Sequence, residues 1–236
     1  MLKKELFERS PIRVLERSIH GGLGKGNLGV FTARKGVGKT ACLVHVSISK
    51  LLRDQKVLHI SIAEDPHHIE NWYEHVFREV ADHYQLENVI DNHDQVIKNR
   101  MILHFKQTDV SLNHVKDSVD QLCTGAQFCP EIFIVDGFSF YSATQSDFDF
   151  WKRLASEHDA AIWFSATLHR ENLQLDTHDV PAPVNQFYDL FSVIIMLNPM
   201  HDYIDLQLLK DHDSDDLEEL KLKLDPKTML IANRKI

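Results

Sequence analysis

The chain has 236 residues, of which 43% are hydrophobic and 26% are charged. These proportions are typical of an ordinary globular protein, and the length suits one large α/β domain or two small ones. The formal net charge of −9 disfavours a protein that mainly grips nucleic-acid phosphates, because that function needs a basic surface. Cys42, Cys123 and Cys129 form neither an even disulfide framework nor a CxxC zinc pattern, so we expect reduced thiols.

The sequence predicts neither a secretory leader nor a membrane anchor. The N-terminus MLKKELFERS is basic but lacks an apolar core, and the longest apolar run, residues 193–197, is too short to span a bilayer. We therefore expect a cytoplasmic protein without a membrane partner.

Short apolar or β-branched runs alternate with longer helical patterns, which is typical of parallel βαβ units. The predicted strands are residues 28–32, 57–63, 101–105, 132–135, 161–166 and 193–197. The predicted helices are residues 39–53, 66–84, 112–122 and 147–158. Because no linker or repeat divides the chain, we expect one domain over residues 1–236, with residues 1–27 as its N-terminal segment.

After residue 197 the hydrophobic period changes to two, in DYIDLQLLKD, EELKLKLD and KTMLIAN. This period predicts an antiparallel extension over residues 198–236 at one edge of the sheet. The acidic run DHDSDD, residues 211–216, is interpreted as a solvated loop tip. It lacks the glycine and the distal glutamate of a calcium loop.

The stretch ARKGVGKT, residues 33–40, follows a predicted strand and opens a predicted helix. It matches the phosphate-loop pattern GxxxxGK[ST], except that alanine replaces the first glycine. The two glycines let the backbone wrap an anion, the lysine supplies charge, and the threonine hydroxyl can ligate Mg²⁺. The alternative is a glycine-containing turn that binds nothing. The predicted nucleotide-binding residues of this region are Ala33, Arg34, Lys35, Gly36, Val37, Gly38, Lys39, Thr40 and Ala41.

A second motif, PEIFIVDG at residues 130–137, places Asp136 directly after four apolar residues. Ligands of open α/β sheets bind at the carboxyl ends of the strands, so we predict that Asp136 lies beside the loop at 33–40. Its carboxylate would hold Mg²⁺ through water, while the Thr40 hydroxyl would bind the ion directly.

The order of these motifs resembles that of the RecA-fold P-loop ATPases of the KaiC and DnaB-helicase type. The resemblance covers about residues 13–212 and is carried by RVLERSIHGGLGKGNLGVFTARKGVGKT, KVLHISIAED, AIWFSATLHREN, and DLFSVIIMLNP with YIDLQLLKDHD. It implies a three-layer αβα, RecA-like fold with a mostly parallel sheet and antiparallel C-terminal strands. It also implies ATP or ADP as ligand, Mg²⁺ as cofactor, and a homo-oligomer such as a hexamer.

The resemblance also assigns catalytic roles. Glu64 matches the general base that orients the attacking water, and the adjacent Asp65 is either its substitute or a helix cap. Lys210 matches the lysine of a K-x-R motif that reaches the nucleotide of the neighbouring subunit, but His212 stands where the family has arginine. Because imidazole lacks arginine's planar fork of donors, this departure predicts slow hydrolysis.

Thr167 and His169 end the strand that resembles the family's sensor strand. A polar side chain there either hydrogen-bonds the γ-phosphate or faces solvent, and the sequence leaves both open. The leading hypothesis is a regulatory or signalling ATPase that acts in an oligomer, with room for a protein partner. Its rivals are a nucleotide-gated binding module with little or no hydrolysis, and a recombination-type DNA-binding ATPase.

Two other stretches invite different functions. The histidine- and glutamate-rich stretch 64–75 would hold a metal only if its ligands converged, and its spacing brings two or three together at best. The aromatic stretch FSFYSATQSDFDFW, residues 138–151, lacks lysine and arginine. We interpret it as the packing surface of a helix that starts near Ser146, ahead of a protein-partner surface or a platform for single-stranded DNA.

Overall fold

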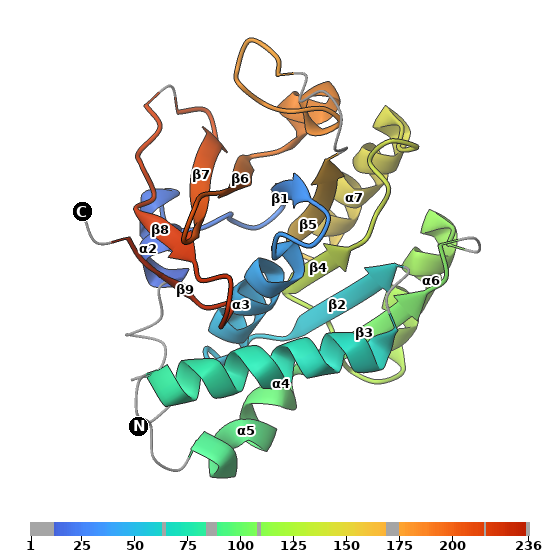
Figure 1. The fold of residues 1–236 in the computed structure, drawn as a ribbon. Coiled ribbons are helices and arrows are strands. Elements are labelled where there is room, and N and C mark those ends of the chain that lie inside the picture. Colours follow the sequence, from blue (N-terminus) through green and yellow to red (C-terminus); the bar gives the residue numbers. More distant parts are fainter. Residues whose placement is uncertain are drawn as a thin grey trace.

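The computed structural model describes residues 12–62, 65–83, 89–107, 110–168, 175–214 and 216–234. Within these residues one nine-stranded sheet runs through the molecule in the order β3-β2-β4-β5-β1-β6-β7-β8-β9 (Figure 1). The strands are β1 (Leu28–Arg34), β2 (Val57–Ile62), β3 (Arg100–Phe105), β4 (Ile132–Asp136), β5 (Ala161–Leu168), β6 (Val193–Pro199), β7 (Ile204–Asp211), β8 (Leu222–Leu224) and β9 (Ile231–Asn233). The helices are α2 (Ile12–Ser18), α3 (Lys39–Leu51), α4 (Pro66–His83), α5 (Val89–Ile97), α6 (Leu112–Thr124), α7 (Gln145–Glu157) and the 3-10 helix η1 (Val184–Leu190).

The first six strands in the sheet order, from β3 at the edge to β6, are parallel to one another. Strands β7, β8 and β9 continue the sheet, and each is antiparallel to the strand before it. This arrangement confirms the predicted α/β class, the mostly parallel sheet and the antiparallel C-terminal strands. The bounds of the six predicted parallel strands and four predicted helices agree with the structure to within two residues. Helices α2, α5 and η1 were not among the predicted helices.

Helices cover both faces of the sheet and give the molecule three layers (Figure 1). One apolar core lies between the sheet and α2, α3, α4 and α5, and a second lies between the sheet and α6, α7 and η1. Strands β1, β2 and β4 are buried along nearly their whole length, as expected for parallel strands covered on both faces. Helix α3 is buried on almost all sides, which explains why its apolar residues are not confined to one face.

The aromatic residues that follow β4 belong to the second core. Phe140 and Phe148 have ring centroids 5.1 Å apart, and Phe148 and Trp151 are fully buried. Helix α7 begins with a capping interaction in which the Asp147 carboxylate accepts a hydrogen bond from the Thr144 backbone N–H at 2.7 Å. The interpretation of this stretch as helix packing is therefore confirmed.

The C-terminal strands fold back onto helix α3. The ring of His45 in α3 contacts this extension through Nε2, which lies 3.0 Å from the Met229 carbonyl oxygen and 3.3 Å from the Ile231 backbone nitrogen. A methyl group added at Gly38 would lie only 2.4 Å from Leu224 Cδ2, so β8 abuts the N-terminus of α3. The C-terminal extension thus packs against the loop that precedes this helix.

The expectation that residues 211–216 form a solvated tip is wrong for the first of them. Asp211 is the last residue of β7 and is 1% exposed. Because β7 is antiparallel to β6, it ends at the amino edge of the parallel strands, next to Val193. There the N-terminal segment covers its carboxylate.

His45 gives the fold a defined acid sensitivity. Burial lowers the pKa of His45 to about 4, from an ordinary value of 6.5. The charged ring is therefore favoured in the unfolded chain, and stability present above pH 6.5 is lost as the pH falls toward 4. We expect a loss from this residue of about 2–3 kcal/mol in the free energy of unfolding between about pH 7 and about pH 4.5.

The measurement is urea unfolding of the wild type and His45→Gln at both pH values. Glutamine retains an N–H donor but does not titrate, so the variant should lose less stability than the wild type on acidification. Equal losses in the two proteins would assign the acid sensitivity to other groups, such as His59, whose pKa burial also lowers to about 4.

Candidate functional site

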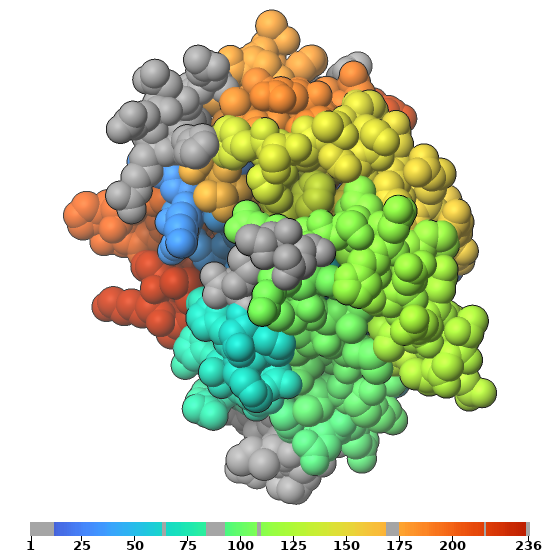
Figure 2. Space-filling model, turned by 90° about the vertical axis from the view of Figure 1, so that its right-hand side faces the viewer, coloured from blue at the N-terminus to red at the C-terminus, as the bar shows by residue number. Residues whose placement is uncertain are grey.

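The loop between β1 and α3 lies at the carboxyl edge of the parallel strands. Gly36 and Gly38 adopt left-handed backbone conformations, with φ values of 82° and 113°. Gly38 immediately precedes α3 and is its N-cap residue. No side chain caps the N-terminus of this helix. The amides of the first helical turn therefore remain open to an anion, which the helix dipole also favours. In Figure 2 the blue part of the chain, which contains this loop, reaches the surface beside the red C-terminal residues.

The Lys39 ammonium bends back over the loop. Its Nζ donates to the carbonyl oxygens of Ala33 and Arg34 at 3.2 Å and 3.1 Å, and the residue is only 8% exposed. Burial lowers the pKa of Lys39 to about 8, although the nearby Asp136 carboxylate acts in the opposite direction. An anion bound in the loop would add a negative charge in direct contact with this ammonium, whose hydrogen bonds go to two carbonyl oxygens.

Thr40 and Asp136 meet at the same edge. The Thr40 hydroxyl donates to Asp136 Oδ2 at 2.7 Å, across 96 residues of sequence. The Ser165 hydroxyl of β5 donates to the other carboxylate oxygen and accepts from the Gly137 backbone N–H at 3.0 Å. The Asp136 carboxylate is 6% exposed. A hydroxyl and a carboxylate offer the oxygen ligands that Mg²⁺ prefers, so this pair can hold the ion.

The other predicted site residues lie near the loop, cap a helix, or fall outside the described residues. Thr167 is exposed and pairs in register with Ala33, so it lies beside the start of the loop. Asp65 caps α4, because its carboxylate accepts from the His67 backbone N–H at 2.8 Å, as the cap interpretation expects. Glu64 and His169 lie outside the described residues. Within the loop region, Arg34 and Lys35 are exposed, Val37 is half-buried and Ala41 is buried.

Lys210 lies toward the opposite edge of the sheet. It pairs with Ile194, which pairs with Val30, four residues before the end of β1. At about 3.3 Å per residue, this places Lys210 roughly 13 Å, measured along the strands, from the end of β1 at Arg34. Its Nζ donates to the Tyr188 carbonyl oxygen at 2.9 Å and lies 4.2 Å from the centre of that ring. Its action on a neighbouring subunit's nucleotide stays a prediction.

Sequence reasoning missed Ser165 and Gly137, which complete the surroundings of Asp136. The signal for Ser165 was a hydroxyl within a mostly apolar strand, AIWFSATL, two residues before Thr167. The signal for Gly137 was its place directly after Asp136, where it adopts a φ of 86°.

The histidines of α4 do not share a site in the described part of the chain. His67 Nδ1 lies 3.2 Å from Glu70 Oε2, whereas His75 Nε2 lies 3.1 Å from the Thr228 carbonyl oxygen. Their rings thus have different partners at separate points along the helix.

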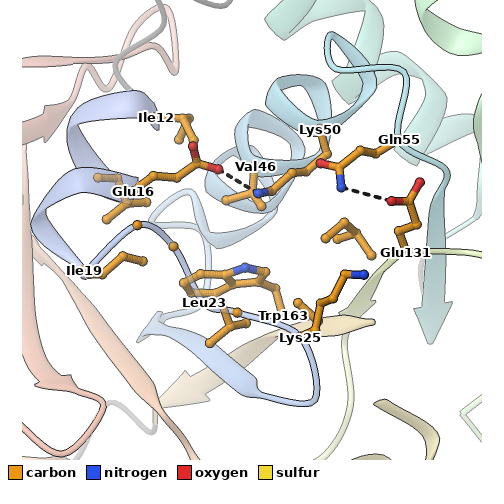
Figure 3. Close-up of a pocket in the computed structure, with 16 residues that line it drawn as sticks. Ile12, Glu16, Ile19, Leu23, Lys25, Val46, Lys50, Gln55, Glu131 and Trp163 are labelled. Carbon is orange, nitrogen blue, oxygen red and sulfur yellow. Dashed lines mark hydrogen bonds and ion pairs between the residues drawn. The ribbon is translucent and has the colours of Figure 1, made fainter. Parts of the chain in front are cut away.

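A cavity of about 140 Å³ lies away from the loop 33–40, at the amino edge of the strands, between α2, α3 and residues 21–25 (Figure 3). Trp163 and Leu23 give it apolar walls. At its rim Lys50 Nζ donates to Glu16 at 2.7 Å, and Gln55 donates to Glu131 at 3.2 Å. Because these rim groups already satisfy one another, we assign no ligand to this cavity.

No protein-family model matches the chain, and a search of curated proteins found no match to its sequence. Among the described residues, none of the helices has the length and apolar character needed to cross a membrane.

Proposed function

We propose that this chain is a RecA-like, KaiC-like P-loop ATPase that binds Mg-ATP at the loop 33–40. The observation that carries the proposal is the 2.7 Å hydrogen bond between the Thr40 hydroxyl and Asp136. It joins the two motifs that a magnesium nucleotide needs, one at the start of a helix and one at the end of a buried strand. The open first turn of α3 and the buried ammonium of Lys39 support the same ligand.

Each group has a role toward the nucleotide. The loop and helix amides bind the phosphate oxygens, and Lys39 exchanges the carbonyls of Ala33 and Arg34 for the outer phosphates. Thr40 and Asp136 would hold Mg²⁺, and the ion would neutralise charge on the phosphates. Thr167 is placed to sense the terminal phosphate. ATP is preferred over other nucleotides on the family resemblance.

Hydrolysis in this proposal is slow and takes place in a homo-oligomer such as a hexamer. Glu64 orients water, and Lys210 reaches the nucleotide of a neighbouring subunit. His212, which replaces the family's arginine, is held by Asp211 at 2.7 Å and by the Leu23 carbonyl oxygen at 3.2 Å. A ring tied down in this way is poorly suited to act on a neighbour, which favours a regulatory or signalling role over rapid turnover.

Calorimetry with Mg-ATP on the wild type, Lys39→Ala and Lys116→Ala tests nucleotide binding. Lys116 is a matched control because it also loses an ammonium, but on α6, where it pairs with Asp120 at 3.1 Å. We expect micromolar binding by the wild type and Lys116→Ala, and a loss of at least about 30-fold in Lys39→Ala. Absence of binding in the wild type, or equal binding by all three, contradicts the proposal.

Turnover separates the ATPase from its rival, the nucleotide-gated binding module, which the restrained His212 also supports. The ATPase predicts a measurable rate in the wild type that falls in Glu64→Gln. Equal, near-zero rates in both proteins would favour the binding module. A mass measurement with and without ATP tests the oligomer in the same samples.

A further inference from the structure

Three side chains from two distant parts of the chain converge at the amino edge of the sheet, away from the loop 33–40. His20 Nδ1 lies 2.6 Å from Asp211 Oδ2, and His212 Nδ1 lies 2.7 Å from Asp211 Oδ1. The ligand atoms of the three residues all lie within 4.8 Å of one another. His20 and Asp211 are 191 residues apart in sequence, so the fold itself builds the cluster.

The hydrogen bonds of His212 show how its ring is oriented. Its Nε2 lies 3.2 Å from the Leu23 carbonyl oxygen. A carbonyl oxygen only accepts, so Nε2 carries the hydrogen of this bond. In the neutral ring Nδ1 then has a lone pair directed at a carboxylate oxygen, which is also an acceptor. Two facing acceptors need either a proton or a metal ion between them.

We propose that His20, Asp211 and His212 bind Zn²⁺ through the two Nδ1 atoms and one carboxylate oxygen. A metal-bound histidine usually donates its other N–H to a carboxylate or a backbone carbonyl, and the bond from His212 Nε2 to Leu23 supplies this support. Two imidazoles and a carboxylate suit zinc, with water in the fourth position. The His20 side chain is 65% exposed, which leaves room for that water.

The present separations need only a small adjustment. Ligands of one tetrahedral zinc ion lie about 3.3 Å apart, because zinc–ligand distances are about 2.0–2.2 Å. The two Nδ1 atoms, which lie 2.6 Å and 2.7 Å from the two Asp211 oxygens, would therefore move away from these oxygens by about 0.6–0.7 Å. Asp211 is buried and fixed at the end of β7, whereas His20 lies on the surface and can supply the movement.

The ion would join the N-terminal segment to β7. It would thereby fix the turn that follows α2, including Leu23, whose side chain lines the cavity in Figure 3. This role is independent of nucleotide binding, so failure of one proposal leaves the other intact.

The test is titration of chelator-treated full-length protein with Zn²⁺ by calorimetry, with Co²⁺ absorption spectra as a second readout. The variants are His20→Asn and His212→Asn, since both histidines have a positive φ (52° and 51°) that asparagine tolerates. The matched control is His201→Asn, because His201 is exposed and lies 2.6 Å from Asp202. We expect one zinc ion per chain, a loss of at least about tenfold in affinity in the two cluster variants, and none in the control.

Zinc should also raise the Tm of the wild type by a few degrees, but not that of the cluster variants. The Co²⁺ spectrum should lack the intense sulfur-to-cobalt band of thiolate ligands. The proposal is overturned by a wild type that binds no zinc, by cluster variants that bind as tightly as the wild type, or by a thiolate spectrum.

Discussion

Gly137→Ala will destabilise the protein by about 3–5 kcal/mol. Gly137 directly follows Asp136 and has a φ of 86°, a conformation that costs other residues about 1–2 kcal/mol. An added Cβ would also lie 2.1 Å from the Ile62 carbonyl oxygen at the end of β2. That atom belongs to the backbone, so the clash can be relieved only by moving β2 or the end of β4.

The measurement is urea unfolding without nucleotide, with Gly36→Ala as the control. Gly36 has a φ of 82°, but an added Cβ there would meet no atom within 4 Å. The control should therefore lose only about 1–2 kcal/mol, and the difference between the variants isolates the clash with Ile62. If both variants lose the same amount, β2 and β4 can separate without cost, and the close approach is not a constraint on the site.

The strands were the most predictable part of this fold. Parallel strands covered on both faces are nearly continuous runs of apolar residues, so their ends are visible in the sequence. The helix α5 was missed because its sequence, VIDNHDQVI, is short and rich in residues that favour turns and caps. Its existence depends on a tertiary contact, the burial of Val96 against the first core, which no local pattern reveals.

The candidate nucleotide site was predictable for a topological reason. The carboxyl ends of β1 and β4 lie at the same edge of the sheet with only β5 between them, so a loop motif after one strand is expected near an aspartate at the end of the other. The cluster of His20, Asp211 and His212 had no such signal. It depends on β7 running antiparallel, which carries an apparently solvated acidic run to the opposite edge. At that edge Asp211 is buried, whereas the acidic sequence DHDSDD by itself predicts a solvent-exposed loop.

The loss of Asp136 should remove the contribution of magnesium to nucleotide binding, if the proposed function is right. In Asp136→Asn the buried side chain keeps its shape but loses the charge that accepts from the Thr40 and Ser165 hydroxyls. We expect Mg-ATP affinity to fall by about 100-fold, to the level of ATP in the presence of a chelator. Asp202→Asn, at an exposed carboxylate, should bind as the wild type does.

Titrations of each protein with ATP, with and without Mg²⁺, distinguish the two charged groups of the site. Lys39 contacts phosphate in the proposal, so Lys39→Ala should weaken binding under both conditions. Asp136 acts through the ion, so Asp136→Asn should weaken binding only when Mg²⁺ is present. The two effects then differ in kind and not merely in size. If Asp136→Asn retains the full magnesium dependence of the wild type, the hydrogen bond between Thr40 and Asp136 only ties α3 to β4, and the ion must be sought elsewhere.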